Sequence, residues 1–129
     1  MPAPLSRQAT AGPLVQVFGT EDSPASRAAL RFFRERRIAP QFIDLRRKPI
    51  AAGELRRFIE RLGARAVADE DGRAWREAGL GYLRMDEAEL AGRLLADQRL
   101  LRLPLVRVGN DVAAGPGEAR WRALLGGRG

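Results

Sequence analysis

Few residues of this chain could carry out covalent chemistry, because its 129 residues include no cysteine and no histidine. Without histidine there is no Ser-His-Asp triad and no histidine zinc site. Without cysteine there is no thiolate nucleophile, disulfide or iron–sulfur cluster. A hydrolase or metalloenzyme would have to work with aspartate, glutamate, lysine or serine alone, and we predict neither a metal site nor an organic cofactor.

One serine stands at a place where its hydroxyl has a clear physical use. Ser23 precedes Pro24 and an apolar helical stripe, and serine caps free backbone N–H groups while proline suits the first helical position. A helix N-terminus favours anions, so Ser23 with Arg27 is a candidate weak anion site. The alternatives are that Ser23 is only a helix cap and that Arg27 is a surface arginine.

The charge of the chain is strongly basic. Lysine and arginine total 23 against 16 acidic residues, which gives a formal charge of +7. Only Lys48 is a lysine, and this preference for arginine is typical of a GC-rich genome. The densest basic stretch runs over 27–48, and Arg31, Arg34 and Arg37 are its candidate interaction face. A solvated basic face and a docking face for a protein or a polyanion are both open.

Three aromatic side chains could in principle stack on nucleic-acid bases. Trp75, Tyr82 and Trp121 are not interleaved with the basic stretch, however. We therefore expect these three side chains to be buried or half-buried in packing contacts.

Hydrophobic periodicity predicts the element order β-α-β, a helical insertion, and then β-β-α. The predicted strands cover residues 14–18, 41–45, 105–108 and 112–114. Helices are predicted from residue 23 to about 37, from about 55 to 62, near 73–78, from 86 to about 95, and around 121–125. Residues 1–13 are predicted to be a disordered leader, and 14–126 one α/β domain with its helical insertion at about 50–100.

Four sequence features in this order resemble one known family. They are the opening strand followed by Arg27, the segment 54–63, the Gly72-x-x-Trp75-Arg76 element, and the segment 100–106. The chain is similar to the ArsC/Spx family, which includes glutaredoxin-coupled arsenate reductases, YffB-like proteins and Spx transcription regulators. The resemblance implies a thioredoxin-like fold with a mixed four-stranded sheet, flanking helices and a helical insertion.

The resemblance also implies where an active site would lie. The nucleophilic cysteine of the family falls on Ser23, and the second cysteine of its CxxC members falls on Ser26. The two arginines that surround the oxyanion in the reductases fall on Asp71 and Leu103. Pro104 is then the proline that precedes the third strand. The degenerate site is accordingly predicted at Ser23, Ser26, Arg27, Asp71, Leu103 and Pro104.

These replacements matter because the family's chemistry needs a thiolate. A helix N-terminus and an arginine lower the pKa of a cysteine, whereas serine has no comparable acidity and no redox couple. Loss of both cysteines and two arginines favours natural decay of the site. An engineered pair of Cys-to-Ser changes would leave Asp71 and Leu103 unexplained. Asp71 is expected to oppose the charge of Arg27.

The proline of the third strand has a conformational prediction of its own. The resemblance implies that the Leu103–Pro104 peptide bond is cis, a form that X-Pro bonds adopt at special positions. The alternative is a trans proline at the first residue of a strand.

The leading hypothesis for function is a redox-inactive, cytoplasmic and monomeric member of this family that acts as a protein-interaction or regulatory module. RNA polymerase is the candidate partner because Spx proteins act on it. One alternative is an arsenate reductase-like oxidoreductase that uses an external thiol such as glutathione. Another is a basic nucleic-acid-binding protein. No membrane association is expected, because no apolar run approaches the roughly 18 residues of a span.

Overall fold

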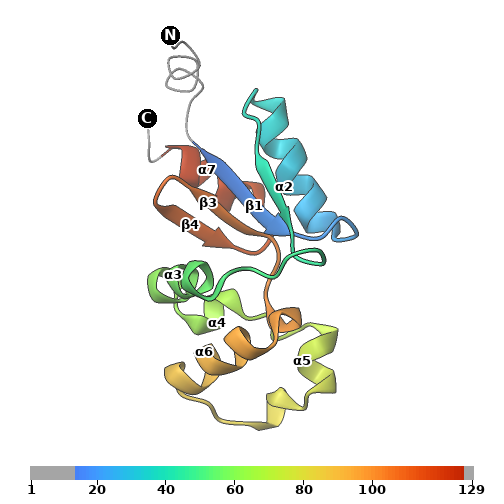
Figure 1. Cartoon of the computed structure of the whole chain (residues 1–129), viewed down its shortest axis with the longest axis vertical. Helices are drawn as coiled ribbons and strands as arrows, with labels where there is room; N and C mark the ends of the chain where they lie inside the picture. The colour runs from blue at the N-terminus through green and yellow to red at the C-terminus, as the bar shows by residue number, and fades with distance from the viewer. Residues whose placement is uncertain (1–13, 127–129) are drawn as a thin grey trace.

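A mixed four-stranded sheet forms the centre of the protein, whose computed structural model describes residues 14–126 (Figure 1). In sheet order the strands are β2 (Gln41–Asp44), β1 (Val15–Gly19), β3 (Leu105–Val108) and β4 (Asp111–Ala114). β1 pairs in parallel with β2 and antiparallel with β3, and β3 and β4 form a hairpin. The predicted mixed sheet is confirmed, whereas the predicted leader over 1–13 lies outside the described residues.

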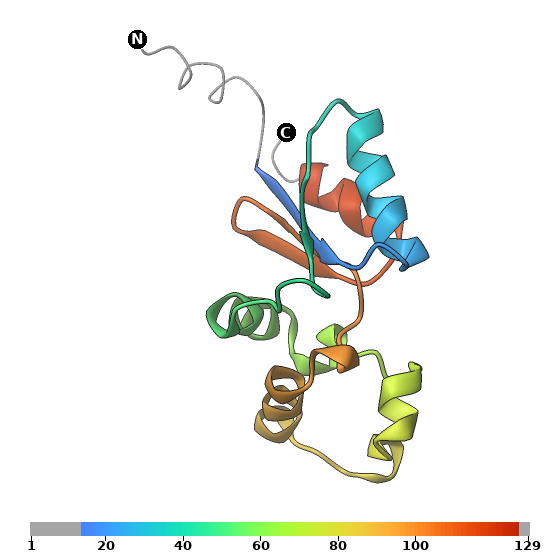
Figure 2. The same ribbon diagram turned by 45° about the vertical axis from the view of Figure 1, so that its right-hand side comes forward.

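Helices cover both faces of this sheet. α2 (Pro24–Glu35) and α7 (Glu118–Gly126) lie side by side on one face, and α3 lies toward the other (Figures 1 and 2). The helical insertion joins β2 to β3 and consists of α3 (Ala52–Leu62), α4 (Ala64–Val67), α5 (Arg73–Glu77), η1 (Leu80–Tyr82), α6 (Glu87–Ala96) and η2 (Gln98–Leu100).

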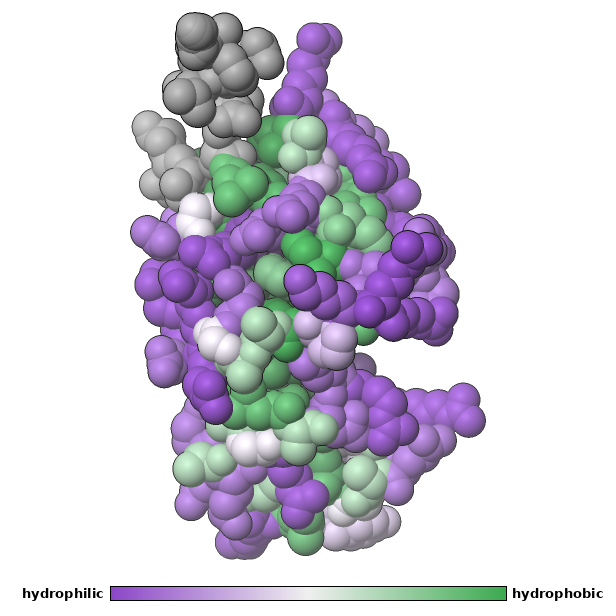
Figure 3. All heavy atoms as spheres, viewed as in Figure 1, coloured by the Kyte–Doolittle hydropathy of each residue, from purple (hydrophilic) through white to green (hydrophobic). Residues whose placement is uncertain are grey.

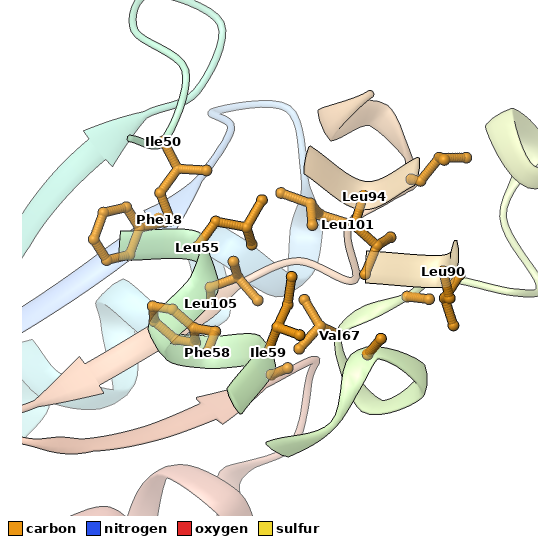
Figure 4. Close-up of a cluster of buried hydrophobic side chains, with 14 of the residues drawn as sticks. Phe18, Ile50, Leu55, Phe58, Ile59, Val67, Leu90, Leu94, Leu101 and Leu105 are labelled. Carbon is orange, nitrogen blue, oxygen red and sulfur yellow. The ribbon is translucent and has the colours of Figure 1, made fainter. Parts of the chain in front are cut away.

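Two hydrophobic clusters hold these layers together, because side chains of a strand alternate between its two faces. Val15 and Val17 of β1 pack toward α2 and α7, with Trp121 in the same cluster. Phe18 of β1 packs on the opposite face with Phe58 of α3, and their ring centroids are 5.8 Å apart. This second cluster continues into the insertion, so the insertion shares a core with the sheet (Figure 4).

Local sequence accounts for most of the helix boundaries. Asp86 and Glu89 form a reciprocal capping box at the start of α6, as the sequence predicts. α3 ends at Gly63, whose φ of +87° suits glycine. α2 ends at Glu35, two residues before the predicted end, and Arg37 adopts a left-handed conformation with φ of +62°.

Two expectations are corrected by the insertion. The short helix α4 directly follows α3 and was not predicted, because four residues carry no readable helical period. Tyr82 was expected to be packed, but it is 95% exposed. Leu80 takes the interior position of the short η1 helix, which leaves Tyr82 pointing to solvent. Trp75 and Trp121 are buried, as predicted.

The Leu103–Pro104 peptide bond is cis, which confirms the conformation implied by the resemblance. Pro104 is buried and immediately precedes β3. Among residues 14–126, no helix combines the length and the apolar character that crossing a bilayer requires.

Candidate functional site

The start of α2 is closed by its own hydrogen bonds. The Ser23 hydroxyl oxygen accepts the backbone N–H of Ser26 at 3.1 Å, and Ser23 itself has the extended backbone of a helix cap. The Ser23 N–H in turn donates to the Thr20 carbonyl at 3.2 Å. The predicted role of Ser23 as a helix cap is therefore confirmed.

Ser26 is packed inside the protein. It is 1% exposed, and its hydroxyl oxygen accepts the backbone N–H of Thr20 at 3.3 Å. Gly19 approaches so closely that a Cβ atom there would lie 2.1 Å from the Ser26 oxygen. The position that carries the second cysteine in CxxC relatives thus belongs to the packing between β1 and α2.

Arg27 turns back over the loop that precedes its helix. Its guanidinium donates to the Glu21 carbonyl at 2.8 Å. The neighbouring carboxylate of Asp22 pairs with Arg46. The pKa of Asp22 lies below its usual value of 3.8, chiefly because the Thr20 side chain hydrogen-bonds to the carboxylate and also because Arg46 is close. Asp22 is therefore ionised at neutral pH beside the helix cap, which disfavours an anion there.

Asp71 and Leu103 lie together in a different hollow, between the insertion and the cis-proline segment. This insertion hollow has a volume of about 490 Å³, and its lining includes Arg65, Asp69, Glu70, Asp71, Arg102 and Leu103. Three carboxylates face two arginines, and Arg65 is already paired with Glu70 at 2.8 Å. The charge of the insertion hollow therefore gives an oxyanion little advantage.

The sequence suggested that Asp71 lies opposite Arg27, but the structure places the two residues in different hollows. Arg27 lines a separate hollow on the outer side of α2, and neither Ser23 nor Ser26 is among the residues that line the insertion hollow. The anion site at Ser23 and Arg27 stays a prediction, with an adjacent negative charge against it. In the described part of the chain, no cluster of three or more acidic side chains is arranged to hold a metal ion.

Sequence reasoning missed two arginines of the insertion hollow. Arg102 immediately precedes Leu103, so a search that allowed a shift of one position could have found it. Its side chain packs against Gly115, where a Cβ atom would lie 2.6 Å from the Arg102 Nε. Arg65 lies on α4, which the sequence pattern does not reveal. Only the tertiary fold brings this helix to the cis-proline segment.

The candidate interaction face is only partly assembled. Arg31 and Arg34 are exposed on α2 and line one hollow of about 740 Å³ together with Arg27, Leu30 and Phe42. Arg37 is exposed at the turn after α2 and does not line this hollow. Among the residues that the structure describes, Arg31 and Arg34 form no hydrogen bond or ion pair.

The sheet, the cis proline before β3 and the cap at the start of α2 define a thioredoxin-like α/β protein. The family model described as the ArsC family matches residues 7–124. The chain belongs to the ArsC family, and its sequence contains no cysteine. No curated protein sequence matches it significantly.

Several solved structures share the fold of this chain. A protein named YFFB superposes with a TM-score of 0.77 at 21% identity, covering 86% of this chain and 98% of that one. An arsenate reductase from Vibrio cholerae gives 0.75 at 21% identity, with coverages of 88% and 99%. An ArsC family related protein from Bacteroides fragilis gives 0.75 at 19% identity, with coverages of 85% and 96%. At these identities the likeness establishes the fold.

Proposed function

We propose that this chain is a redox-inactive member of the ArsC family that acts as a protein-interaction or regulatory module. The observation that carries the proposal is the hydrogen bond from the Ser26 N–H to the Ser23 hydroxyl oxygen, because it makes Ser23 a helix cap and the resemblance places the nucleophile of the family at this residue. Reduction of arsenate by this family draws two electrons from thiols that form a disulfide. Serine has no sulfur and cannot form one, and the chain contains no cysteine.

An interaction role is supported by what the scaffold retains. The sheet and the insertion share one well-packed cluster, so the fold persists without the chemistry. Among the described residues, no carboxylate forms an ion pair with Arg27, Arg31 or Arg34, the exposed arginines along α2. RNA polymerase is the candidate partner on the basis of the resemblance to Spx regulators. An acidic surface on such a partner would be attracted to a basic helix.

An arsenate reductase-like activity with glutathione as an external thiol is the alternative enzyme. It is favoured by the arsenate reductase from Vibrio cholerae among the similar structures. It would need a site that binds arsenate and positions the thiol. Asp22 at the helix cap and the three carboxylates in the insertion hollow oppose such a site electrostatically.

Nucleic-acid binding is the third candidate, and charge alone supports it. Trp75 and Trp121 are buried and so cannot act as base-stacking platforms. Binding of this kind would fall steeply as salt rises from low to physiological concentration. A filter-binding assay with single-stranded and double-stranded DNA in a salt series tests this alternative directly.

Partner capture at physiological salt tests the interaction module. The tagged chain is incubated with nuclease-treated cytosol, and retained proteins are identified by mass spectrometry. The matched bait carries Arg31→Glu and Arg34→Glu, and the control bait carries Arg84→Glu and Arg93→Glu, which reverse two exposed arginines of the insertion. We expect one reproducible partner, lost only with the first pair. Retention of no specific partner by the unaltered chain contradicts the proposal.

An activity assay tests the redox-inactive part of the proposal. We expect arsenate-dependent oxidation of glutathione to stay at the level of a control without protein. Ser23→Cys alone should also be inactive, because Asp71 and Leu103 still occupy the two arginine positions that the resemblance implies. Turnover by the unaltered chain above the control would instead establish the enzyme alternative.

A further inference from the structure

Within residues 14–126, β2 is an edge strand whose outer side is open. Its one partner in the described sheet is β1, and the Leu45 N–H that follows β2 donates to the Gly19 carbonyl at 2.8 Å. In a parallel pair, alternate residues bond to the neighbouring strand. The same alternation directs the backbone of Ile43 toward β1, and it directs the backbones of Phe42 and Asp44 toward the open side.

This open edge is short and offers few backbone groups to a partner. The Asp44 carbonyl already accepts the N–H groups of Arg47 and Lys48, each at 3.0 Å. Pro40 precedes the strand and has no N–H to offer. The groups that remain for a partner are the N–H and carbonyl of Phe42 and the N–H of Asp44. Short edges with a proline resist indiscriminate pairing, so an added strand would need side-chain contacts as well.

On the α2 side of the edge, a hollow presents a basic stripe. Arg27, Arg31 and Arg34 lie at positions i, i+4 and i+7, which places them on one face of α2. They line the hollow of about 740 Å³ together with Phe42. The two carboxylates of the hollow lie at its ends: Glu21 precedes α2, and Glu35 is the last residue of α2. The middle of this hollow is therefore positive.

On the α3 side of the same edge, a second hollow is mainly apolar in its lining. It has a volume of about 500 Å³, and its apolar lining includes Phe18, Ile43, Pro49 and Ile50. The polar residues at its border are Gln16, Gln41, Asp44, Arg47 and Lys48, of which Arg47 and Lys48 add positive charge to this side of the edge as well. Glu54 also lines it, but this carboxylate is held by two contacts of 2.9 and 3.0 Å from Arg107. In the space-filling view, hydrophobic residues are visible over the sheet, and hydrophilic residues border them on the α2 side (Figure 3).

We propose that the β2 edge binds an extended segment of a protein partner as an additional strand, and that this segment alternates acidic and apolar residues. Side chains of a strand alternate between its faces, so acidic ones would enter the basic hollow beside α2 and apolar ones the hollow beside α3. This inference rests on the proposed interaction function and names the chemistry of the partner.

The spacing of the arginines fits such a segment. Four helical residues separate Arg27 from Arg31, which is about 6 Å along the axis of α2. Alternate residues of an extended strand are about 6.8 Å apart. One acidic side chain of the bound segment therefore meets Arg31, and the next lies within the reach of Arg34. Arg27, whose guanidinium also donates to the Glu21 carbonyl, adds positive charge at the other end of the stripe.

A second copy of the chain is a less suitable occupant. Pairing of two β2 edges would bring two basic α2 stripes toward each other and would supply only Asp44 as an acidic strand residue. Two positively charged faces repel at moderate salt. The test includes this occupant as an outcome.

The test uses a fluorescent peptide of alternating glutamate and valine with the full chain, read out by anisotropy at physiological salt. The controls are a peptide of the same composition in scrambled order, an alternating glutamine–valine peptide, and the original peptide with N-methyl groups on alternate backbone nitrogens. N-methylation removes strand hydrogen bonds without altering the protein. Arg31→Glu with Arg34→Glu is the test variant, and Arg84→Glu with Arg93→Glu is the control of equal charge.

We expect the alternating acidic peptide to bind, and each control peptide and the Arg31 and Arg34 double variant to weaken binding at least about tenfold. The control variant should bind as the unaltered chain does. Equal binding of the scrambled or N-methylated peptide overturns the added strand. A concentration-dependent dimer in sedimentation, with no peptide binding, overturns the acidic partner in favour of a second copy.

The outcome is distinguishable from failure of the proposed function. Capture of a specific partner that depends on Arg31 and Arg34, combined with no binding of the alternating peptide, overturns this inference and leaves the interaction module intact. Peptide binding by a chain that captures no partner contradicts the proposed function instead. Unfolding curves of both double variants verify that each is folded.

Discussion

The start of α2 and its exposed outer face differ sharply in how their polar groups are used. At the helix start, residues 19–27, the hydroxyls of Ser23 and Ser26 are occupied by backbone N–H groups, and Arg27 binds a carbonyl. Further along α2, Arg31 and Arg34 have no such partner among the described residues. Groups that are satisfied internally hold the fold together, and groups left unsatisfied at the surface remain available for binding.

The difference also explains why the site of the family's chemistry has become structural. A hydroxyl serves a helix cap as well as any group does, so serine keeps the fold after the thiol is gone. Close packing then acts on the same residues, because Gly19 leaves no room between β1 and Ser26. The arginines on the outer face of α2 are exposed and are under no such packing constraint.

The largest effect is expected at the tight contact of the helix start. Gly19→Ala would force a Cβ atom to within 2.1 Å of the Ser26 oxygen, and overpacking of this kind costs about 2–3 kcal/mol of unfolding free energy. Urea unfolding measures the loss. The double variant with Ser26→Gly should recover part of it, and a loss below about 0.5 kcal/mol in the single variant would show that the helix start is loosely packed.

Removal of the cap should cost less. Ser23→Ala deletes the oxygen that accepts the Ser26 N–H, which is expected to lower the unfolding free energy by about 1 kcal/mol. Ser23→Asp should retain most of the stability because aspartate also caps helices. Thermal unfolding followed by circular dichroism compares the three chains. Equal stability of the alanine variant would contradict the structural role of Ser23.

Neutralising the outer arginines should hardly change stability. Arg27, Arg31 and Arg34 are neighbours on one helix face, and like charges at these spacings destabilise a helix by about 0.2–0.5 kcal/mol per pair. Arg31→Gln with Arg34→Gln is therefore expected to leave the unfolding free energy unchanged or slightly raised at low salt. A loss above about 1 kcal/mol would mean that these arginines are structural, and the contrast with the helix start would disappear.

The smallest effect concerns Asp22, whose exposed carboxylate has its pKa lowered from 3.8 by the Thr20 side chain and by Arg46. A carboxylate with a lowered pKa in the folded state adds stability above 3.8, and this contribution is lost as pH falls through the lowered value. Asp22→Asn should thus melt slightly below the unaltered chain at pH 7. The difference between the two melting temperatures should begin to shrink as pH falls below 3.8 and vanish once pH is below the lowered pKa of Asp22, and a difference that does not shrink with falling pH would exclude ionisation as its cause.

Several features of the fold were predictable because their causes are local. The cap at Ser23, the capping box of Asp86 and Glu89, and the alternation of β1 each depend on residues close in sequence. The replacement of both cysteines by serine could also be predicted from the sequence, since it needs only the resemblance and a count of residues back from Arg27. The cis bond before Pro104 was an implication of the family that the structure confirms.

Other features depend on how distant elements meet. The exposure of Tyr82 cannot be predicted from the residues around it. Leu80 of the same short helix η1 is the residue that is buried, and this is decided by how η1 packs on the insertion. Arg65 reaches the cis-proline segment through α4, whose single turn has no readable period. The direction of Arg27 is likewise decided by a loop carbonyl, which turns its charge away from Asp71.

The sequence by itself determined the order of elements, the loss of thiol chemistry and the basic character of α2, because these follow from residue type and short-range periodicity. Only the tertiary structure decided that a basic hollow and an apolar hollow flank one open strand edge. That arrangement arises from packing α2 and α3 on opposite faces of the sheet that β2 borders, and such long-range contacts are encoded by the burial of the whole core rather than by any single motif.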